Sequence, residues 1–229
     1  MLAIVYVAGF VGSILFTSAG LRYVNFGDQV PLFQPLHAFC TLFVAVNIMI
    51  CLWEISLYLH RDLIQHKFKQ HKLQLKRGEL PNPLFLLKSI TFAQAASFEF
   101  WSEVWATYSL LDVCYSEHGS FGFNIDVGNG FSTLLPNILF IFAMNGVGLG
   151  MSHRLFGVVS ILFFYQAFYG TVVYFFQYNL NKRWEEHDTA KYFWPLVVGT
   201  NGFWFVGPWA CMYACWKMIE SDSIQVFLN

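Results

Sequence analysis

The sequence carries very little charge. Only 12% of its 229 residues are Asp, Glu, Lys or Arg, whereas a soluble domain usually has about 25%. Hydrophobic residues make up 56% of the chain and aromatic residues 20%. A net charge of −1 provides no basic surface for a nucleic acid. We therefore expect a polytopic helical membrane protein with no nucleic acid among its partners.

Several features of other protein classes are also missing. The five cysteines form no CxxC pair, and four of them lie in long apolar runs, so we interpret them as apolar packing residues. No basic region precedes the first apolar run, which favours a retained membrane helix over a cleaved signal peptide. His60, His66 and His71 lack the HExxH spacing. We interpret their segment as a solvated basic stretch and predict no metal and no cofactor.

Long uncharged runs predict five transmembrane helices, because a helix needs about 20 apolar residues to cross a bilayer. The runs are residues 1–21, Asp28 to Glu54 with a continuation to Leu59, Asp126 to Arg154, Arg154 to Lys182, and 192–216. The predicted fold is an all-α polytopic bundle of five transmembrane helices with an interfacial helix before the third. We treat residues 1–229 as one membrane domain, in which residues 2–21 form an extra N-terminal transmembrane helix.

Lysine and arginine are distributed unevenly between the two predicted sides of the membrane. Most lie on the side that holds the N-terminus and the loops at 60–88 and 181–193, while the other side has Arg22, Arg154 and Lys217. Because cytoplasmic loops carry an excess of positive charge, we expect the N-terminus in the cytoplasm and the C-terminus across the membrane.

The region between the second and third runs has a different character. A basic segment follows His60 and breaks at Pro81 and Pro83. Large apolar residues then recur at a spacing of three and four, which predicts an amphipathic helix at the membrane surface or packed on the bundle. These residues are Phe98, Trp101, Val104, Trp105 and Tyr108. Residues 116–130 are rich in Gly, Asn and Asp and predict an ordered loop.

Two positions inside the apolar runs carry polar groups that hydrocarbon disfavours. In the last run, Asn201, Trp204 and Pro208 share one helical face, which must look at protein or at a ligand because an amide facing lipid is left unsatisfied. In the second run, Glu54 lies within a span, and Asn47 lies seven residues earlier on the same face. An intramembrane carboxylate suggests a proton donor or acceptor, or a partner for a ligand amine. The alternative is a structural Glu bonded to a neighbouring helix.

Other polar and aromatic side chains extend this list of candidates. Glu99 and Glu103 are four residues apart and either share a proton or a metal or form the wet side of an interfacial helix. Asp112 and Asp126 are interpreted as anchors of loop turns. The fourth run contains aromatic and amide groups around Gly170 that predict either a ligand contact or close helix packing. They are Gln166, Tyr169 and Tyr174.

Three motifs resemble those of the emopamil-binding, or EXPERA, family of sterol Δ8-Δ7 isomerases and their sterol- and drug-binding relatives. NGFWFVGP in the last run is similar to the family's N-x-x-W-x-x-x-P, and YQAFYGTVVYF in the fourth to Q-x-x-Y-G-x-x-x-Y. WATYSLLDVCY resembles the short signature before the third span. The resemblance covers roughly residues 45–217 and implies an EXPERA-like bundle over approximately 36–219, in the endoplasmic reticulum membrane.

The resemblance also implies a reaction. An acidic group protonates a ring double bond, aromatic faces and a carboxylate stabilise the carbocation, and a base removes a proton from a neighbouring carbon. It implies catalytic roles for Glu54, Asn201 and Trp204. The residues expected to contact a ligand are Asn47, Gln166, Tyr169, Tyr174, Glu99, Glu103, Tyr108 and Asp112.

The chain departs from the family pattern at two positions, where Ile50 replaces a His and Pro136 lies at or near the position of a second Glu. A proton shuttle needs a donor and an acceptor within reach of one substrate. Three functions therefore stay open: an enzyme acting on a sterol or another polycyclic or isoprenoid lipid, a non-catalytic lipid-binding protein, and a structural or accessory subunit. The expected partners are a membrane lipid or sterol, with a homo-oligomer or a larger membrane complex as a further possibility.

Overall fold

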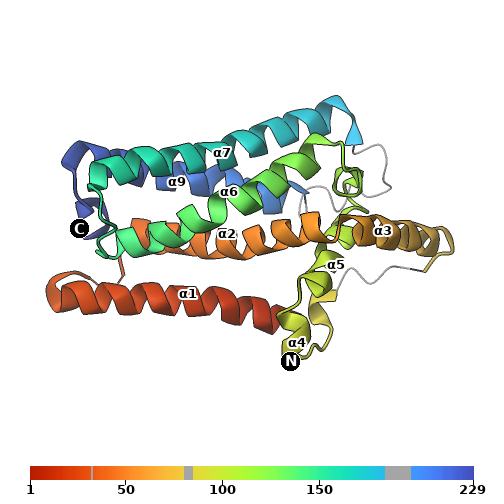
Figure 1. The fold of residues 1–229 in the computed structure, drawn as a ribbon, viewed down its shortest axis with the longest axis horizontal. Helices are drawn as coiled ribbons and strands as arrows, with labels where there is room; N and C mark the ends of the chain where they lie inside the picture. The colour runs from red at the N-terminus through yellow and green to blue at the C-terminus, as the bar shows by residue number, and fades with distance from the viewer. Residues whose placement is uncertain (32, 80–84, 184–196) are drawn as a thin grey trace. The chain divides into compact units, whose positions relative to one another are not determined.

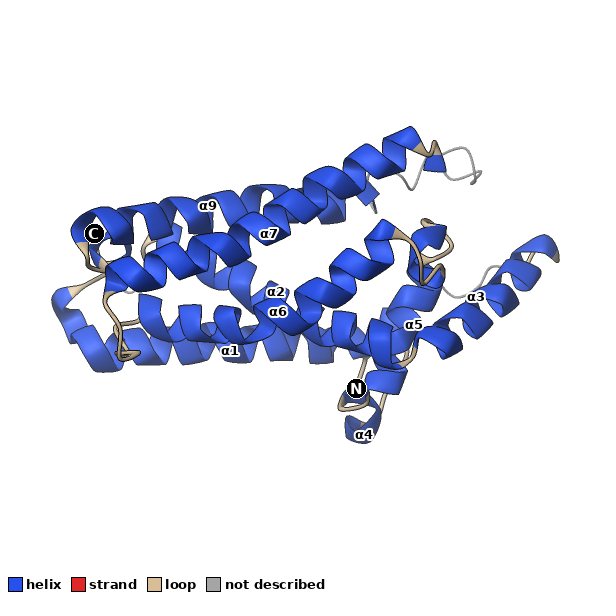
Figure 2. Ribbon diagram, turned by 45° about the horizontal axis from the view of Figure 1, so that its top comes forward, coloured by secondary structure: helices blue, strands red, loops and turns tan. Residues whose placement is uncertain are grey.

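The structure, a computed structural model, describes residues 1–31, 33–79, 85–183 and 197–229. This part of the chain forms eight α-helices joined by loops and short 3-10 turns, as Figures 1 and 2 show. The helices are α1 (Ala3–Phe26), α2 (Pro35–Leu59), α3 (Arg61–Lys76), α4 (Phe92–Ala95), α5 (Phe98–Tyr108), α6 (Phe121–Met144), α7 (His153–Leu180) and α9 (Gly199–Ser221). The prediction of an all-α fold is confirmed.

Four of these helices, α1, α2, α6 and α7, are long and apolar enough to cross a membrane. Even the 24 residues of α6 extend about 36 Å at 1.5 Å per residue, which exceeds a hydrocarbon core of about 30 Å. In length and composition these four helices agree with the multi-pass membrane prediction. The fifth predicted span is represented by α9, which ends in the charged residues Lys217 and Glu220 and is not among the four. Residues 192–196 of that run lie outside the described part, so a fifth span stays a prediction.

The predicted loop at residues 116–130 is wrong from Phe121 onward, because α6 begins there. The Ser120 hydroxyl accepts a hydrogen bond from the backbone N–H of Phe123 at 3.1 Å and so caps the first turn. Asp126 consequently lies in a helix and does not anchor a loop turn. The cap and the packing described below outweigh the low helix propensity of Asn129 and Gly130.

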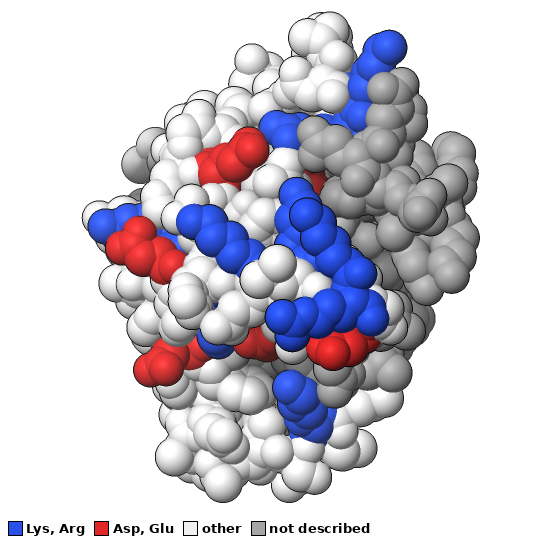
Figure 3. Space-filling model, turned by 90° about the vertical axis from the view of Figure 1, so that its right-hand side faces the viewer, with Lys and Arg blue, Asp and Glu red and all other residues white. Residues whose placement is uncertain are grey.

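The basic segment after His60 also forms a helix, α3. Ile64 and Phe68, four residues apart, are buried, and α3 packs against α5. Asp62, His66 and Lys69, which point away from this buried face, are exposed. Figure 3 shows Lys and Arg side chains gathered on this side of the molecule. The segment is therefore amphipathic, and its charged face is solvated as predicted.

The described chain divides into two compact units. Unit 1 comprises residues 1–9, 50–131 and 174–199, and unit 2 comprises residues 10–49, 132–173 and 200–229. The prediction of a single membrane domain over residues 1–229 is not tested by this division.

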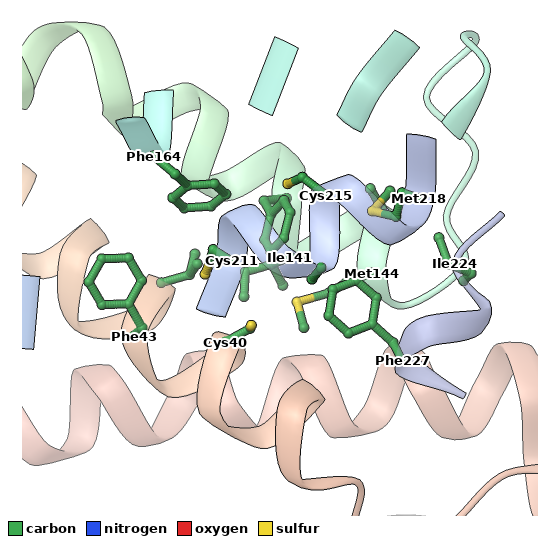
Figure 4. Packing of buried hydrophobic residues seen from close by; sticks show 14 of the residues in the cluster. Cys40, Phe43, Ile141, Met144, Phe164, Cys211, Cys215, Met218, Ile224 and Phe227 are labelled. Carbon is green, nitrogen blue, oxygen red and sulfur yellow. The ribbon is translucent and has the colours of Figure 1, made fainter. Parts of the chain in front are cut away.

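The core of unit 2 is built from aromatic rings and sulfur-containing side chains of α2, α6, α7 and α9 (Figure 4). The rings of Phe140 and Phe164 meet edge to face at 4.9 Å. Gly207 of α9 lies directly on Phe43, because a methyl group at Gly207 would lie 2.1 Å from that ring. The cysteines of this core are buried and free, as is Cys114 of unit 1, which confirms their interpretation as packing residues.

Unit 1 is organised around the aromatic face of α5. Trp101 stacks on Trp53 of α2 at 5.4 Å, and the indole N–H of Trp105 donates to the Trp53 carbonyl at 2.6 Å. Glu99 on the other face is exposed. The predicted amphipathic helix is therefore confirmed, whereas its position at a membrane surface stays a prediction.

Candidate functional site

Glu54 is the one acidic residue of α2, and it is buried. Its side chain is 5% exposed, and its Oε2 atom is buried without a hydrogen-bond partner. Gly130 of α6 packs directly on it, because a methyl group at Gly130 would lie 2.7 Å from the Glu54 Cβ and 3.0 Å from the carbonyl oxygen of Cys51. The close approach of α6 therefore holds Glu54 away from solvent.

A second carboxyl group, that of Asp126 on α6, lies within electrostatic reach of Glu54. The two are close enough to interact electrostatically, and Asp126 accepts a hydrogen bond from the Tyr115 hydroxyl. Asp126 precedes Gly130 by one helical turn, so both lie on the face of α6 that looks at α2. Glu54 is buried and Asp126 is partly buried, and a pair of carboxyl groups of this kind is chemically suited to donate and accept a proton.

The sequence placed Asp126 in a loop and did not predict its position near Glu54. A four-residue spacing of small and acidic residues was the available signal, since Gly122, Asp126 and Gly130 share one face of α6. A methyl group at Gly122 would lie 2.5 Å from the sulfur of Cys114, just as one at Gly130 would meet Glu54. This face packs closely along its length, and Asp126 is its one acidic group.

A cluster of tyrosines lies near Asp112 and Asp126 within unit 1. The ring of Tyr115 contacts Tyr108 at 5.2 Å and Tyr174 at 6.5 Å. The Tyr174 hydroxyl is buried near the Asp112 carboxylate but has no partner in hydrogen-bond geometry. Burial and the nearby Asp126 carboxylate raise the pKa of Tyr115 well above its usual range. Tyr115 is therefore a protonated hydrogen-bond donor at neutral pH.

Asp112 also has the turn-anchoring role that the sequence predicted. Its Oδ1 atom accepts a hydrogen bond from the backbone N–H of Cys114 at 3.0 Å and so caps the 3-10 turn Val113–Ser116. This turn places Tyr115 among the other tyrosines. Asp112 therefore positions the cluster through the backbone.

The remaining candidates from the apolar runs lie in unit 2. The indole N–H of Trp204 on α9 donates to the Asn47 side-chain oxygen on α2 at 2.7 Å. Gln166 of α7 donates to the Ser132 hydroxyl at 2.8 Å. Asn201 is half-buried. Tyr169 is 52% exposed, so it lies on the surface of its unit and does not line an interior.

The structure therefore brings together two groups of predicted residues. Unit 1 contains Glu54, Tyr108, Asp112 and Tyr174. Unit 2 contains the Asn47–Trp204 pair, Asn201, Gln166 and Tyr169. The joint catalytic role that the resemblance implies for Glu54, Asn201 and Trp204 stays a prediction.

Glu99 and Glu103 do not act as a pair. Glu99 is exposed, whereas Glu103 turns to α3, where it meets the Lys67 ammonium at 3.0 Å and the His71 Nε2 atom at 2.9 Å. Within the described ranges, no group of three or more His, Cys, Asp or Glu side chains is arranged to hold a metal. Glu103 therefore lies in the contact between α3 and α5, and only Glu99 fits the predicted wet side of the helix.

We expect the contact between α3 and α5 to weaken above neutral pH. The hydrogen bond between them raises the pKa of His71 above 6.5 and lowers the pKa of Glu103 to about 2. The stability that His71 contributes is complete below pH 6.5 and is lost as the pH rises through its raised pKa. The contribution of Glu103 is complete above pH 4.5 and is lost only as the pH falls toward 2. We expect a loss of about 1 kcal/mol between about pH 6 and about pH 9.

Melting temperatures of the wild type and of the His71→Gln variant at these two pH values test this expectation. The variant should lose the pH-dependent difference. His66→Gln is the matched control, because His66 lies on the exposed face of the same helix and contacts Gln70. An equal pH dependence in both variants would contradict the role of His71.

Searches against protein-family models, curated proteins and solved structures find no match for the chain.

Proposed function

We propose that the protein is an EXPERA-like integral membrane protein that binds a sterol or another polycyclic or isoprenoid lipid within the bilayer. The buried Glu54 carboxyl with its unpartnered oxygen carries the proposal. An acidic group without a partner in an apolar interior is unfavourable unless a ligand or a reaction uses it. The neighbouring tyrosine rings offer flat, polarisable surfaces that suit a polycyclic ligand and a developing positive charge.

We propose further that the lipid is isomerised by proton transfer at this site. Glu54 would donate a proton to one carbon of a ring double bond, and the π electrons form the new C–H bond. A proton then leaves a neighbouring carbon for Asp126, and its C–H electrons form the new double bond. Atoms and electrons balance without an oxidant or reductant. The hydrogen bond from Tyr115 holds the Asp126 carboxylate in place.

A structural or accessory subunit of a larger membrane complex is the second candidate function. It is supported by large aromatic side chains on the surface of unit 2, which suit packing against another membrane protein. They are Tyr165, Tyr169, Trp209, Tyr213 and Trp216. Polar groups held in the interior of unit 1 have no use in that role, so we favour the lipid-handling function.

Conversion of a Δ8 sterol by the purified protein tests the proposal. In deuterated water we expect a Δ7 product with one deuterium at the protonated carbon, and mass spectrometry should find a sterol-like lipid retained after purification. Retention without conversion would indicate a non-catalytic lipid-binding protein. Neither sterol nor conversion, together with proteins that co-purify in fixed ratio, would favour the structural subunit.

The same resemblance suggests the endoplasmic reticulum as the membrane of residence. A fluorescent fusion that co-localises with a marker of that organelle would support this part of the proposal.

A further inference from the structure

A buried polar network in unit 2 has no part in the proposed function. The Asn145 side-chain amide donates to the Ser18 hydroxyl at 2.8 Å, and its oxygen lies 2.9 Å from the His37 Nε2 atom. The Thr41 hydroxyl donates to the His37 carbonyl at 2.7 Å. All four side chains are buried, and each has a polar partner. The hydrogen-bonding groups of these four side chains are therefore satisfied within the apolar interior of unit 2.

Arg22 is the exception in this region. Its side chain is 1% exposed, and its Nε atom donates to the Pro31 carbonyl at 3.1 Å. Its two terminal nitrogens, Nη1 and Nη2, are buried and have no hydrogen-bond partner. None of the ion pairs found in the described ranges includes Arg22. The guanidinium is therefore fixed in orientation while its four terminal N–H donors are unsatisfied.

The buried, unpaired guanidinium of Arg22 indicates that an anion binds there. A guanidinium stays protonated in proteins, and a buried charge without a partner is strongly unfavourable. Arg22 lies one turn before the end of α1, where the helix dipole favours a positive charge, but no carbonyl group of the helix end accepts a hydrogen bond from its terminal nitrogens. The neighbouring network cannot supply the charge, because it consists of neutral amide and hydroxyl groups with a histidine.

Geometry and position narrow the choice of anion. The two terminal nitrogens of an arginine present parallel donors that match two oxygens of one phosphate. α1 is long enough to cross a bilayer, so a residue one turn from its end lies near the headgroup region. We propose that Arg22 binds the phosphate group of a phospholipid at this end of α1. The site is independent of Glu54, so the two proposals stand or fall separately.

Native mass spectrometry in a mild detergent tests the site. We expect the wild type to retain one phospholipid per chain and Arg22→Gln to retain at least ten-fold less. Arg154→Gln is the matched control, because the Arg154 Nε atom also donates to a backbone carbonyl, that of Ile219 at 3.1 Å, but its side chain is exposed. Glu54→Gln should retain the phospholipid as the wild type does.

Delipidated wild-type protein then identifies the source of the phosphate. We expect phosphatidylglycerol to raise the melting temperature by several degrees, and neither diacylglycerol nor inorganic phosphate to do so. An equal rise with inorganic phosphate would overturn the lipid and assign a free anion. No rise with either phosphate source would overturn the site, because solvent then satisfies Arg22. These measurements use the wild type and hold even where Arg22→Gln fails to fold.

Discussion

Replacing Glu54 with glutamine is expected to reduce sterol conversion by at least about 100-fold, while lipid binding and the fold stay close to wild type. Glutamine keeps the shape of the side chain but cannot donate or accept the transferred proton. Positioned acids and bases contribute about 10²–10⁴-fold to rates. The Glu54 Oε2 atom has no hydrogen-bond partner to lose, so the amide should cost little stability. Deuterium incorporation measures the rate, and the melting temperature reports the fold.

Two further variants serve as the control and as a second test of the proton transfer. Glu99→Gln removes an exposed carboxyl group from α5 and should leave the rate unchanged. Asp126→Asn should slow conversion as Glu54→Gln does, because it removes the proposed proton acceptor. Unchanged turnover in Glu54→Gln would exclude Glu54 as the proton carrier, even if the protein still binds a sterol.

Replacing Gly130 with alanine is expected to destabilise unit 1 by about 1–3 kcal/mol, the usual range for overpacking. The new methyl group would lie 2.7 Å from the Glu54 Cβ, 3.0 Å from the Cys51 carbonyl oxygen and 3.1 Å from the Ile55 nitrogen. Two of these atoms belong to the backbone, so no side-chain rotation relieves the contact. α2 and α6 must separate, which also moves Glu54 relative to Asp126 and should slow conversion.

Gly128→Ala is the matched control, two residues earlier on the same helix. A methyl group there would meet nothing within 4 Å. Alanine is favoured over glycine inside a helix by about 1 kcal/mol, so the melting temperature of this variant should rise while that of Gly130→Ala falls. At about 2–4 °C per kcal/mol for a chain of this size, both shifts are measurable. Equal behaviour of the two variants would show that α6 does not pack tightly on Glu54.

The helices that the sequence predicted best are those with long, uninterrupted apolar runs. α7 matches its run within about two residues, and α2 ends at Leu59 as predicted but begins at Pro35, seven residues after Asp28. Length and hydropathy suffice to identify such helices, although not every boundary. The start of α6 was missed because Gly128, Asn129 and Gly130 are typical of loops. Contact with α2 and the cap from Ser120 decide its structure, and only the capping residue is local in sequence.

The candidate site was predictable in part for a related reason. Glu54 is conspicuous because it interrupts an apolar run, and that signal led to the correct buried position. Asp126 was assigned to a loop, so its position within electrostatic reach of Glu54 depended on a helix that begins before the predicted run, at Phe121. Arg22 lies where the first run ends, a position at which an arginine usually reaches water, and only the surrounding packing buries it.

The stacked indoles of Trp53 and Trp101 give unit 1 an optical signal of its own. The two rings lie 5.4 Å apart and are inclined by 25°, so their electronic transitions couple and produce a paired band in far-ultraviolet circular dichroism. Trp53 is the chain neighbour of Glu54, so this band reports on the surroundings of the carboxyl group without an added label. Trp209 and Trp216 lie on the surface of unit 2 and emit from a different environment, which lets fluorescence follow the two units separately.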